Sequence, residues 1–184
     1  MIDVIIPAYN AERYISQTLE SLVGHADSIG SIIVVNDGST DQTGQLVISF
    51  AQNHPRLPIE LINQTNGGLS HARNIGIAHG KSPFMALLDA DDLWLADKLR
   101  LQSELFQASG DPSLGLVYCG YELIDEHGAL LSKSRGIIAP RLRGNVHQAL
   151  QKGNFISGSG SSVLIRRSVF DAVGLFNEQL PACE

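Results

Sequence analysis

The sequence predicts an α/β fold in which a mostly parallel sheet is flanked by helices. Four short apolar runs in residues 1–92 alternate with three segments of helical spacing, which is typical of an open, Rossmann-like sheet. The apolar runs are continuous instead of alternating, as expected for strands with helices on both faces. Each run also ends in a polar cluster, and ligands of open parallel sheets bind at the carboxyl ends of strands.

The first half is expected to run βαβαβαβ. Its strands are predicted at residues 3–6, where Pro7 ends the run, and at 31–35, 59–62 and 83–88. Helices are predicted at residues 11–26, 41–53 and 69–80, the last of which ends at Gly80.

The second half is expected to add non-parallel strands to the same sheet. We predict a helix at 96–109, a hairpin of 114–125 with 129–134, a short helix at 144–152, a strand at 161–167 and a helix at 168–174. The chain is therefore predicted to form one domain, residues 1–184, with a ligand-binding half at 1–92 and a second half at 93–184.

Composition excludes several classes of protein. The chain has 184 residues, of which 43% are hydrophobic and 17% charged, as in globular domains. A net charge of -6 argues against a nucleic-acid binder, which normally has a basic face. Cys119 and Cys183 form no framework, which fits a reducing, cytoplasmic setting. We expect neither a signal peptide nor a membrane span, and the sequence does not indicate an oligomeric state.

An acidic cluster follows the fourth predicted strand in "FMALLDADDLW". Two carboxylates about 6 Å apart repel by roughly 3 kcal/mol at an effective dielectric near 20, so Asp89, Asp91 and Asp92 together need a cation or a proton. A helix cap would explain one of them, Asp92. Asp89 and Asp91 would point the same way from a locally extended backbone. The cluster therefore predicts a site for Mg²⁺ or Mn²⁺, which use carboxylates together with phosphate oxygens.

The other strand ends carry "PAYN", "NDGSTD" and "NQTNGG". Structural roles explain part of them, because Asn10, Thr40 and Asp41 are all good helix caps. A purely structural role is harder to assign to Asp37, since it lies where the second predicted strand opens into the cleft. The glycines before the third helix suit a loop that presents N–H groups to an anion. For Arg73, a surface salt bridge and an anion contact are equally compatible with its position. Neither of the usual glycine-rich phosphate motifs is present.

Four quoted motifs together resemble the family 2 glycosyltransferases of GT-A fold, namely "VIIPAYNAERYISQTLESL", "IIVVNDGSTDQT", "NGGLSHARNIGIAHG" and "FMALLDADDLWLADKL". The similarity continues through "GSGSSVLIRRSVFDAVGLFNEQLPACE" and so covers nearly the whole chain. It implies inverting transfer of a sugar from a nucleotide diphosphate donor, most often UDP-linked, to the hydroxyl of a glycan, lipid-linked or other acceptor. Such enzymes use a divalent cation and build polysaccharides, glycolipids or cell-envelope glycans.

The resemblance also implies roles for individual residues. It places Pro7, Ala8, Tyr9 and Asn10 around the nucleoside, and Asp37 on the base, beside an Asn36 that departs from the commoner Asp. It assigns nucleotide contacts to Asn66, Gly67, Gly68 and Arg73. Asp91 matches the direct metal ligand of the D-x-D motif, with Asp89 nearer the ribose or a metal-bound water.

The catalytic base of the family follows a "G-x-F-x-E" segment in an "ED" motif. Here "GLFNEQLPACE" ends at Glu184, one residue short of that Asp. The resemblance therefore predicts a truncated chain, one that binds donor and transfers no sugar at a useful rate.

Three alternatives were weighed against this interpretation. A sugar-phosphate nucleotidylyltransferase usually has a glycine-rich, basic signature after the first strand, and "PAYNAERY" matches it poorly. A phosphatase with an Asp nucleophile has D-x-D-x-[TV] on its first strand, whereas this motif follows the fourth strand and has Leu93 at the last position. A non-catalytic nucleotide-binding domain stays open.

Overall fold

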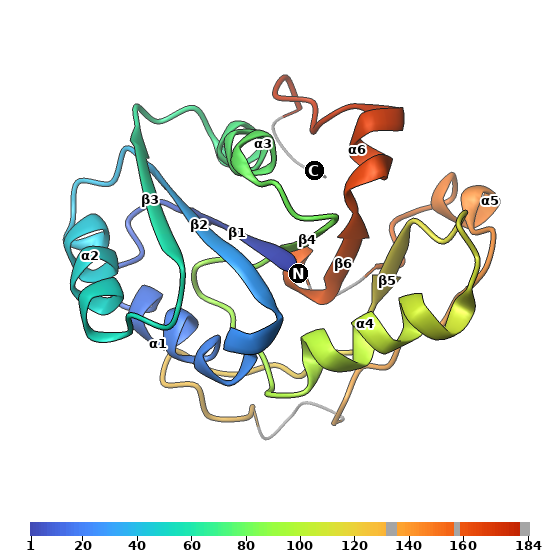
Figure 1. Ribbon diagram of the computed structural model, residues 1–184, viewed down its shortest axis with the longest axis horizontal. Helices are drawn as coiled ribbons and strands as arrows, with labels where there is room; N and C mark the ends of the chain where they lie inside the picture. The colour runs from blue at the N-terminus through green and yellow to red at the C-terminus, as the bar shows by residue number, and fades with distance from the viewer. Residues whose placement is uncertain (132–135, 157–158, 181–184) are drawn as a thin grey trace.

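The structure, a computed structural model, describes residues 1–131, 136–156 and 159–180. One six-stranded sheet spans both halves of the chain in the order β3-β2-β1-β4-β6-β5 (Figure 1). The strands are β1 (Ile2–Ala8), β2 (Ile29–Asp37), β3 (Ile59–Gln64), β4 (Phe84–Leu87), β5 (Leu116–Tyr118) and β6 (Val163–Arg166). The helices are α1 (Ile15–Glu20), η1 (Val23–Ser28), α2 (Thr43–Asn53), α3 (Leu69–His79), α4 (Lys98–Ser109), α5 (His147–Leu150), η2 (Gly160–Ser162) and α6 (Arg167–Val173).

The sheet is mostly parallel, as predicted. Strands β1 to β4 run parallel to their neighbours, and β6 joins antiparallel to both β4 and β5. The strand order reverses at β1, which lies between β2 and β4. In sheets of this kind the crevice beside the reversal is where ligands bind.

Helices cover both faces of the sheet, which explains the continuous apolar strands. Helices α1, α2 and α4 pack on one face and α3 and α6 on the other (Figure 1). Alternate residues of β1 serve the two layers: Val4 and Ile6 face α1, whereas Ile5 faces α3, and all three are fully buried. Apolar side chains are therefore needed on both faces of this part of β1, and the run Val4–Ile6 is continuous instead of alternating.

Strand β1 and the first predicted helix differ from the prediction. Strand β1 continues through Pro7 to Ala8, in register with Val35 and Asn36 of β2. Pairing with β4 ends at Ile5 and Leu87, so the N–H that proline lacks interrupts no bond there. The single helix predicted at 11–26 is two short helices, and the Ser21 hydroxyl donates to the carbonyl of Thr18 at their junction.

The predicted hairpin was only partly correct. Residues 123–131 do turn back, with an antiparallel bridge between Ile124 and Leu130, but form no regular strand pair. The regular strand in this region is β5, and its partner is β6, with Leu116 opposite Ile165. Residues 132–134 of the predicted second hairpin strand lie outside the described residues.

Candidate functional site

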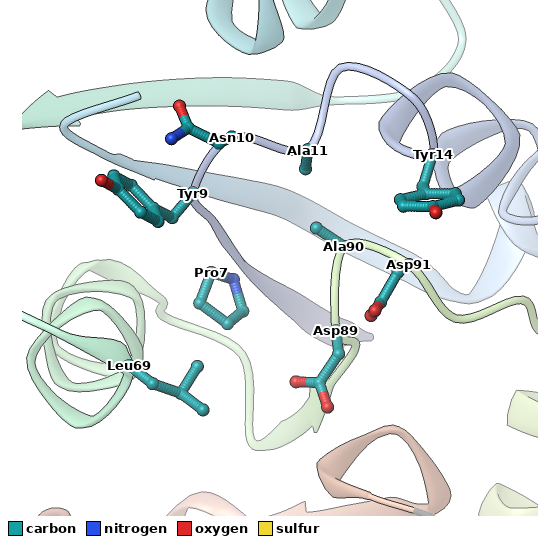
Figure 2. A pocket seen from close by; sticks show the side chains of 9 residues that line it. All are labelled: Pro7, Tyr9, Asn10, Ala11, Tyr14, Leu69, Asp89, Ala90 and Asp91. Atoms are coloured by element: carbon teal, nitrogen blue, oxygen red, sulfur yellow. The ribbon is translucent and has the colours of Figure 1, made fainter. Parts of the chain in front are cut away.

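Two adjoining pockets lie at the carboxyl ends of β1, β2 and β4, beside the start of α3. The larger, of about 350 Å³, is shown in Figure 2 and is lined by Pro7, Tyr9, Asn10, Ala11, Tyr14, Leu69, Asp89, Ala90 and Asp91. The smaller, of about 190 Å³, is lined by Pro7, Ala8, Tyr9, Asp37, Asn66, Gly68, Leu69 and Ala72. The polar strand ends thus do gather at one edge, and two of the ten predicted nucleotide-binding residues, Gly67 and Arg73, line neither pocket.

Asp37 organises the smaller pocket. Its carboxylate is almost fully buried and accepts hydrogen bonds from the backbone N–H of Gly67 at 2.8 Å and of Gly68 at 2.9 Å. The side-chain amide of Gln64 donates a third bond at 2.7 Å. The anion that the glycine loop binds in this structure is therefore the Asp37 carboxylate itself, and Gly68 meets it with a positive φ of 89°.

Asn10 connects two loops at the rim and does not cap a helix, since α1 begins only at Ile15. Its side-chain oxygen accepts from the N–H of Thr40, and its own N–H donates to the Ser39 hydroxyl. The left-handed φ of 48° at Asn10 is one that asparagine tolerates well. The loops after β1 and β2 are therefore joined. The ring of the neighbouring Tyr9 is exposed beside the larger pocket (Figure 2).

The three carboxylates after β4 have three different surroundings. Asp89 accepts a hydrogen bond from the guanidinium of Arg73 at 2.9 Å. Asp92 accepts from two serine hydroxyls, those of Ser159 at 2.7 Å and Ser161 at 2.6 Å. Among the residues that the structure describes, Asp91 has no hydrogen bond or ion pair with another residue. Asp91 is therefore the carboxylate of this group that is left for a ligand.

The backbone of residues 89–92 is a tight turn and not the extended segment that was expected, because the N–H of Asp92 donates to the carbonyl of Asp89. Both Asp89 and Asp91 still project toward the larger pocket (Figure 2). Although Asp91 is an exposed residue, partial burial of its carboxyl raises its pKa above the usual range, and the charges of Asp92 and Asp89 add to this. Asp92 caps no helix, since α4 begins six residues later, at Lys98.

Arg73 lies behind the pocket wall. It is buried on α3, next to the ring of Phe176, whose centroid is 5.6 Å from its guanidinium carbon. The surface salt bridge considered for it is therefore excluded, because its ion pair with Asp89 is mostly inside the protein.

The segment after α6 is held against the same helix. The Asn74 side chain pairs with both backbone groups of Phe176, each at 2.9 Å, and donates to the Glu178 carboxylate at 2.8 Å. His71 bonds to the same carboxylate at 3.0 Å. Six residues further lies Glu184, the predicted base candidate, which is outside the described residues.

Several of these residues were missed by the sequence prediction. Tyr14 and Leu69 line the pockets, and Asn74, Ser159 and Ser161 hold the surrounding segments. The structure leaves Leu69 exposed. In the sequence, its position directly after a glycine pair and at the start of a predicted helix is the signal that could have identified it.

The carboxylate oxygens beside the larger pocket fit a divalent cation of the Mg²⁺ or Mn²⁺ type. Within the described ranges, no three His, Cys, Asp or Glu side chains group closely enough to hold a metal by themselves. These cations typically use one or two protein carboxylates and complete their shell with water and substrate phosphate. Asp91, which pairs with no other residue of the described ranges and has a raised pKa, supplies such a ligand, and Asp89 lines the same pocket.

Comparison with known proteins identifies the family of the fold. Residues 3–174 match the protein family described as "Glycosyl transferase family 2". An uncharacterized glycosyltransferase of Rickettsia felis is 29% identical over 100% of this chain, which spans 30% of that protein. The Escherichia coli UDP-Glc:alpha-D-GlcNAc-diphosphoundecaprenol beta-1,3-glucosyltransferase WfgD is 30% identical over 69% of this chain and 48% of its own length.

A solved structure shows the same architecture. The mannosyltransferase PcManGT from Pyrobaculum calidifontis, in complex with GDP-Man and Mn²⁺, superposes with a TM-score of 0.71 and 25% identity over 98% of this chain and 48% of its own. This likeness confirms the expected GT-A type of α/β fold. In the described part of the chain, no helix combines the length and the apolar character needed to cross a membrane.

Proposed function

The chain belongs to the family 2 glycosyltransferases, and from this premise we propose that it transfers a sugar from a UDP-linked donor to an acceptor hydroxyl with inversion. The observation that carries the proposal is Asp91, whose carboxylate has no partner among the described residues and lies beside a pocket of about 350 Å³. A nucleoside diphosphate brings the phosphate oxygens that complete the shell of a cation held there.

The two pockets divide the nucleotide between them in this proposal. The base occupies the smaller pocket beside Asp37, and the ribose and diphosphate occupy the larger one, next to Tyr9, Asp89 and Asp91. Asp37 keeps capacity for the base, since Oδ2 accepts one bond, from Gly68, and a carboxylate oxygen accepts two. When bound, a divalent cation stabilises the negative charge that develops on the leaving diphosphate.

The acceptor is proposed to be a growing glycan of the cell envelope, carried on a lipid. This proposal is supported by the activity in the name of WfgD, whose acceptor is a diphosphoundecaprenol-linked sugar. We propose a cytoplasmic site for the reaction, in agreement with the cysteine content. That residues 1–184 bind donor without useful turnover stays a prediction, which a sugar-transfer assay of this chain would test.

Calorimetric titration with UDP tests the donor site directly. The wild-type protein should bind UDP more tightly with Mn²⁺ than with a chelator, and Asp91→Asn should lose most of that gain. Asp171→Asn, on an exposed face of α6, makes the same charge change away from the pocket and should keep the gain. Equal UDP affinity with and without Mn²⁺ in the wild type would contradict the proposal.

A further inference from the structure

A segment from the second half of the chain contacts the acidic turn of residues 89–92. Residues 159–162, called here the serine segment, lie between the edge of the described region at 159 and strand β6. Three hydrogen bonds join the segment to the turn. The hydroxyls of Ser159 and Ser161 donate to Asp92, and the backbone N–H of Asp89 donates to Ser161.

Ser161 contacts both ends of the turn with a single hydroxyl. It donates to Asp92 Oδ2 at 2.6 Å and accepts from the N–H of Asp89 at 2.9 Å. The residue is only 6% exposed, so water does not easily replace either bond. The single proton of the hydroxyl is used in the bond to Asp92, and one of its lone pairs accepts the N–H of Asp89. The hydroxyl therefore links the two ends of the turn and restrains the distance between them.

Ser159 adopts a conformation that suits glycine. Its φ of 63° and ψ of -179° belong to a region that side chains rarely occupy. Its hydroxyl donates to Asp92 at 2.7 Å and accepts from the N–H of Ser161 at 3.1 Å. These two bonds give a reason for a serine at this position.

The serine segment is anchored independently of Asp92. The indole N–H of Trp94 donates to the carbonyl of Ser161 at 2.9 Å, and the buried Gln102 of α4 donates to the carbonyl of Ser162, also at 2.9 Å. Helix α4 and the indole therefore hold the serines in place. The acidic turn therefore packs against serines that Trp94 and Gln102, two residues outside the turn, hold in place.

We propose that Ser161, assisted by Ser159, is a positioning residue for the cation site. The two hydroxyls hold the Asp92 carboxylate away from Asp91, so that Asp91 faces the pocket as the direct ligand. This inference rests on the proposed function, because it assigns Asp92 a supporting role at the same site. Groups that orient metal ligands typically contribute 10- to 100-fold to metal affinity. A loss of about this size is expected when the Ser161 hydroxyl is removed.

The test measures Mn²⁺ affinity in the presence of UDP, by counting free Mn²⁺ with electron paramagnetic resonance. Ser161→Ala should bind Mn²⁺ at least tenfold more weakly, at the lower end of that range, while its UDP affinity in a chelator stays unchanged. Ser162→Ala is the matched control, since in the described part of the chain the Ser162 hydroxyl bonds to the carbonyl of Ser159 and not to the turn. Asp92→Asn keeps an acceptor for the serines and should lose less affinity than Asp92→Ala.

The outcomes separate this inference from the proposed function. If the wild type shows no Mn²⁺-dependent UDP binding, both are overturned. If the wild type shows it and Ser161→Ala matches Ser162→Ala, only the positioning role is overturned. Should Ser161→Ala fail to fold, Ser159→Gly decides, because glycine suits this backbone and removes one hydroxyl from Asp92. Reduced Mn²⁺ affinity in Ser159→Gly supports the inference, and wild-type affinity overturns it.

Discussion

Arg73 and Asp89 form an ion pair beside the larger pocket, with 2.9 Å between the guanidinium nitrogen and the carboxylate oxygen. Their side chains are 6% and 21% exposed, so removing the guanidinium takes a charged partner from a mostly buried carboxylate. Arg73→Met should therefore lower the free energy of unfolding by roughly 2 to 4 kcal/mol. Urea denaturation followed by the fluorescence of Trp94, the single tryptophan, measures this.

The double variant Arg73→Met with Asp89→Asn is the control for that prediction. The double variant removes both members of this ion pair, so it should lose less stability than the sum of the two single variants. Strictly additive losses would show that the pair contributes nothing as a pair.

Gly76 allows α3 to approach β1 closely. A Cβ added there would lie 2.4 Å from Cγ2 of the fully buried Ile5. Gly76→Ala should therefore lower the free energy of unfolding by about 1 to 3 kcal/mol, because the helix must shift. At Gly24 the nearest atom, in Ala96, is 3.8 Å away, so Gly24→Ala serves as the control in the same denaturation experiment. Equal effects of the two substitutions would contradict the steric explanation.

Asn74 is expected to hold the segment at 175–180 on α3. Asn74→Leu keeps a similar volume and removes the hydrogen bonds to Phe176 and Glu178, which should cost about 1 to 3 kcal/mol. Hydrogen exchange of the Phe176 amide should accelerate. His71→Ala removes only the more exposed contact to Glu178 and should change exchange little. Similar exchange rates in both variants would mean that Asn74 does not hold the segment.

Lys98 provides a test of pH dependence. Its ammonium lies 4.0 Å from the ring centroid of Trp94, and burial lowers the pKa of Lys98 to about 8. The unfolded chain, with an ordinary pKa of 10.5, then binds more protons between these two values, so stability contributed by this residue rises with pH across that window. Below pH 8 both states are protonated and the cost of burying the charge is fully present.

The measurement compares Lys98→Met with the wild type in urea from neutral to alkaline pH. The advantage of the methionine variant, at most roughly 3 kcal/mol, should be greatest at neutral pH and shrink as pH rises. Lys152→Met, at an exposed lysine, should show no such trend. A constant difference between Lys98→Met and the wild type would place the lysine pKa at its ordinary value.

The sequence predicted the sheet and the edge where its polar residues gather, because both depend on local patterns. Continuous apolar strands and terminal polar clusters are visible within ten residues of chain. The surroundings of each side chain are not. Ser161 meets Asp92 from 69 positions away, and Asn74 meets Phe176 from 102. Nothing near either residue in the sequence indicates such a partner.

The errors of the prediction have a similar cause. The apolar run around Leu116 was predicted as a non-parallel strand and is one, but the run itself does not identify the strand with which it pairs. The nearest following apolar run was chosen, whereas the strand pairs with β6 at Ile165. Likewise, helical spacing through Leu22 does not reveal that the Ser21 hydroxyl bonds to the preceding turn where α1 ends.

The stretch from Gly68 to Asn74, at the start of helix α3, contacts three different parts of the molecule. Gly68 just precedes the helix and meets Asp37, Arg73 meets Asp89, and Asn74 meets Phe176. Each helical residue advances the direction of its side chain by about 100°. One inserted or deleted residue between Gly68 and Arg73 would therefore turn the last two contacts away together. The length of this stretch is therefore under constraint, because a single substitution removes one of these contacts whereas a change in the number of residues removes both together.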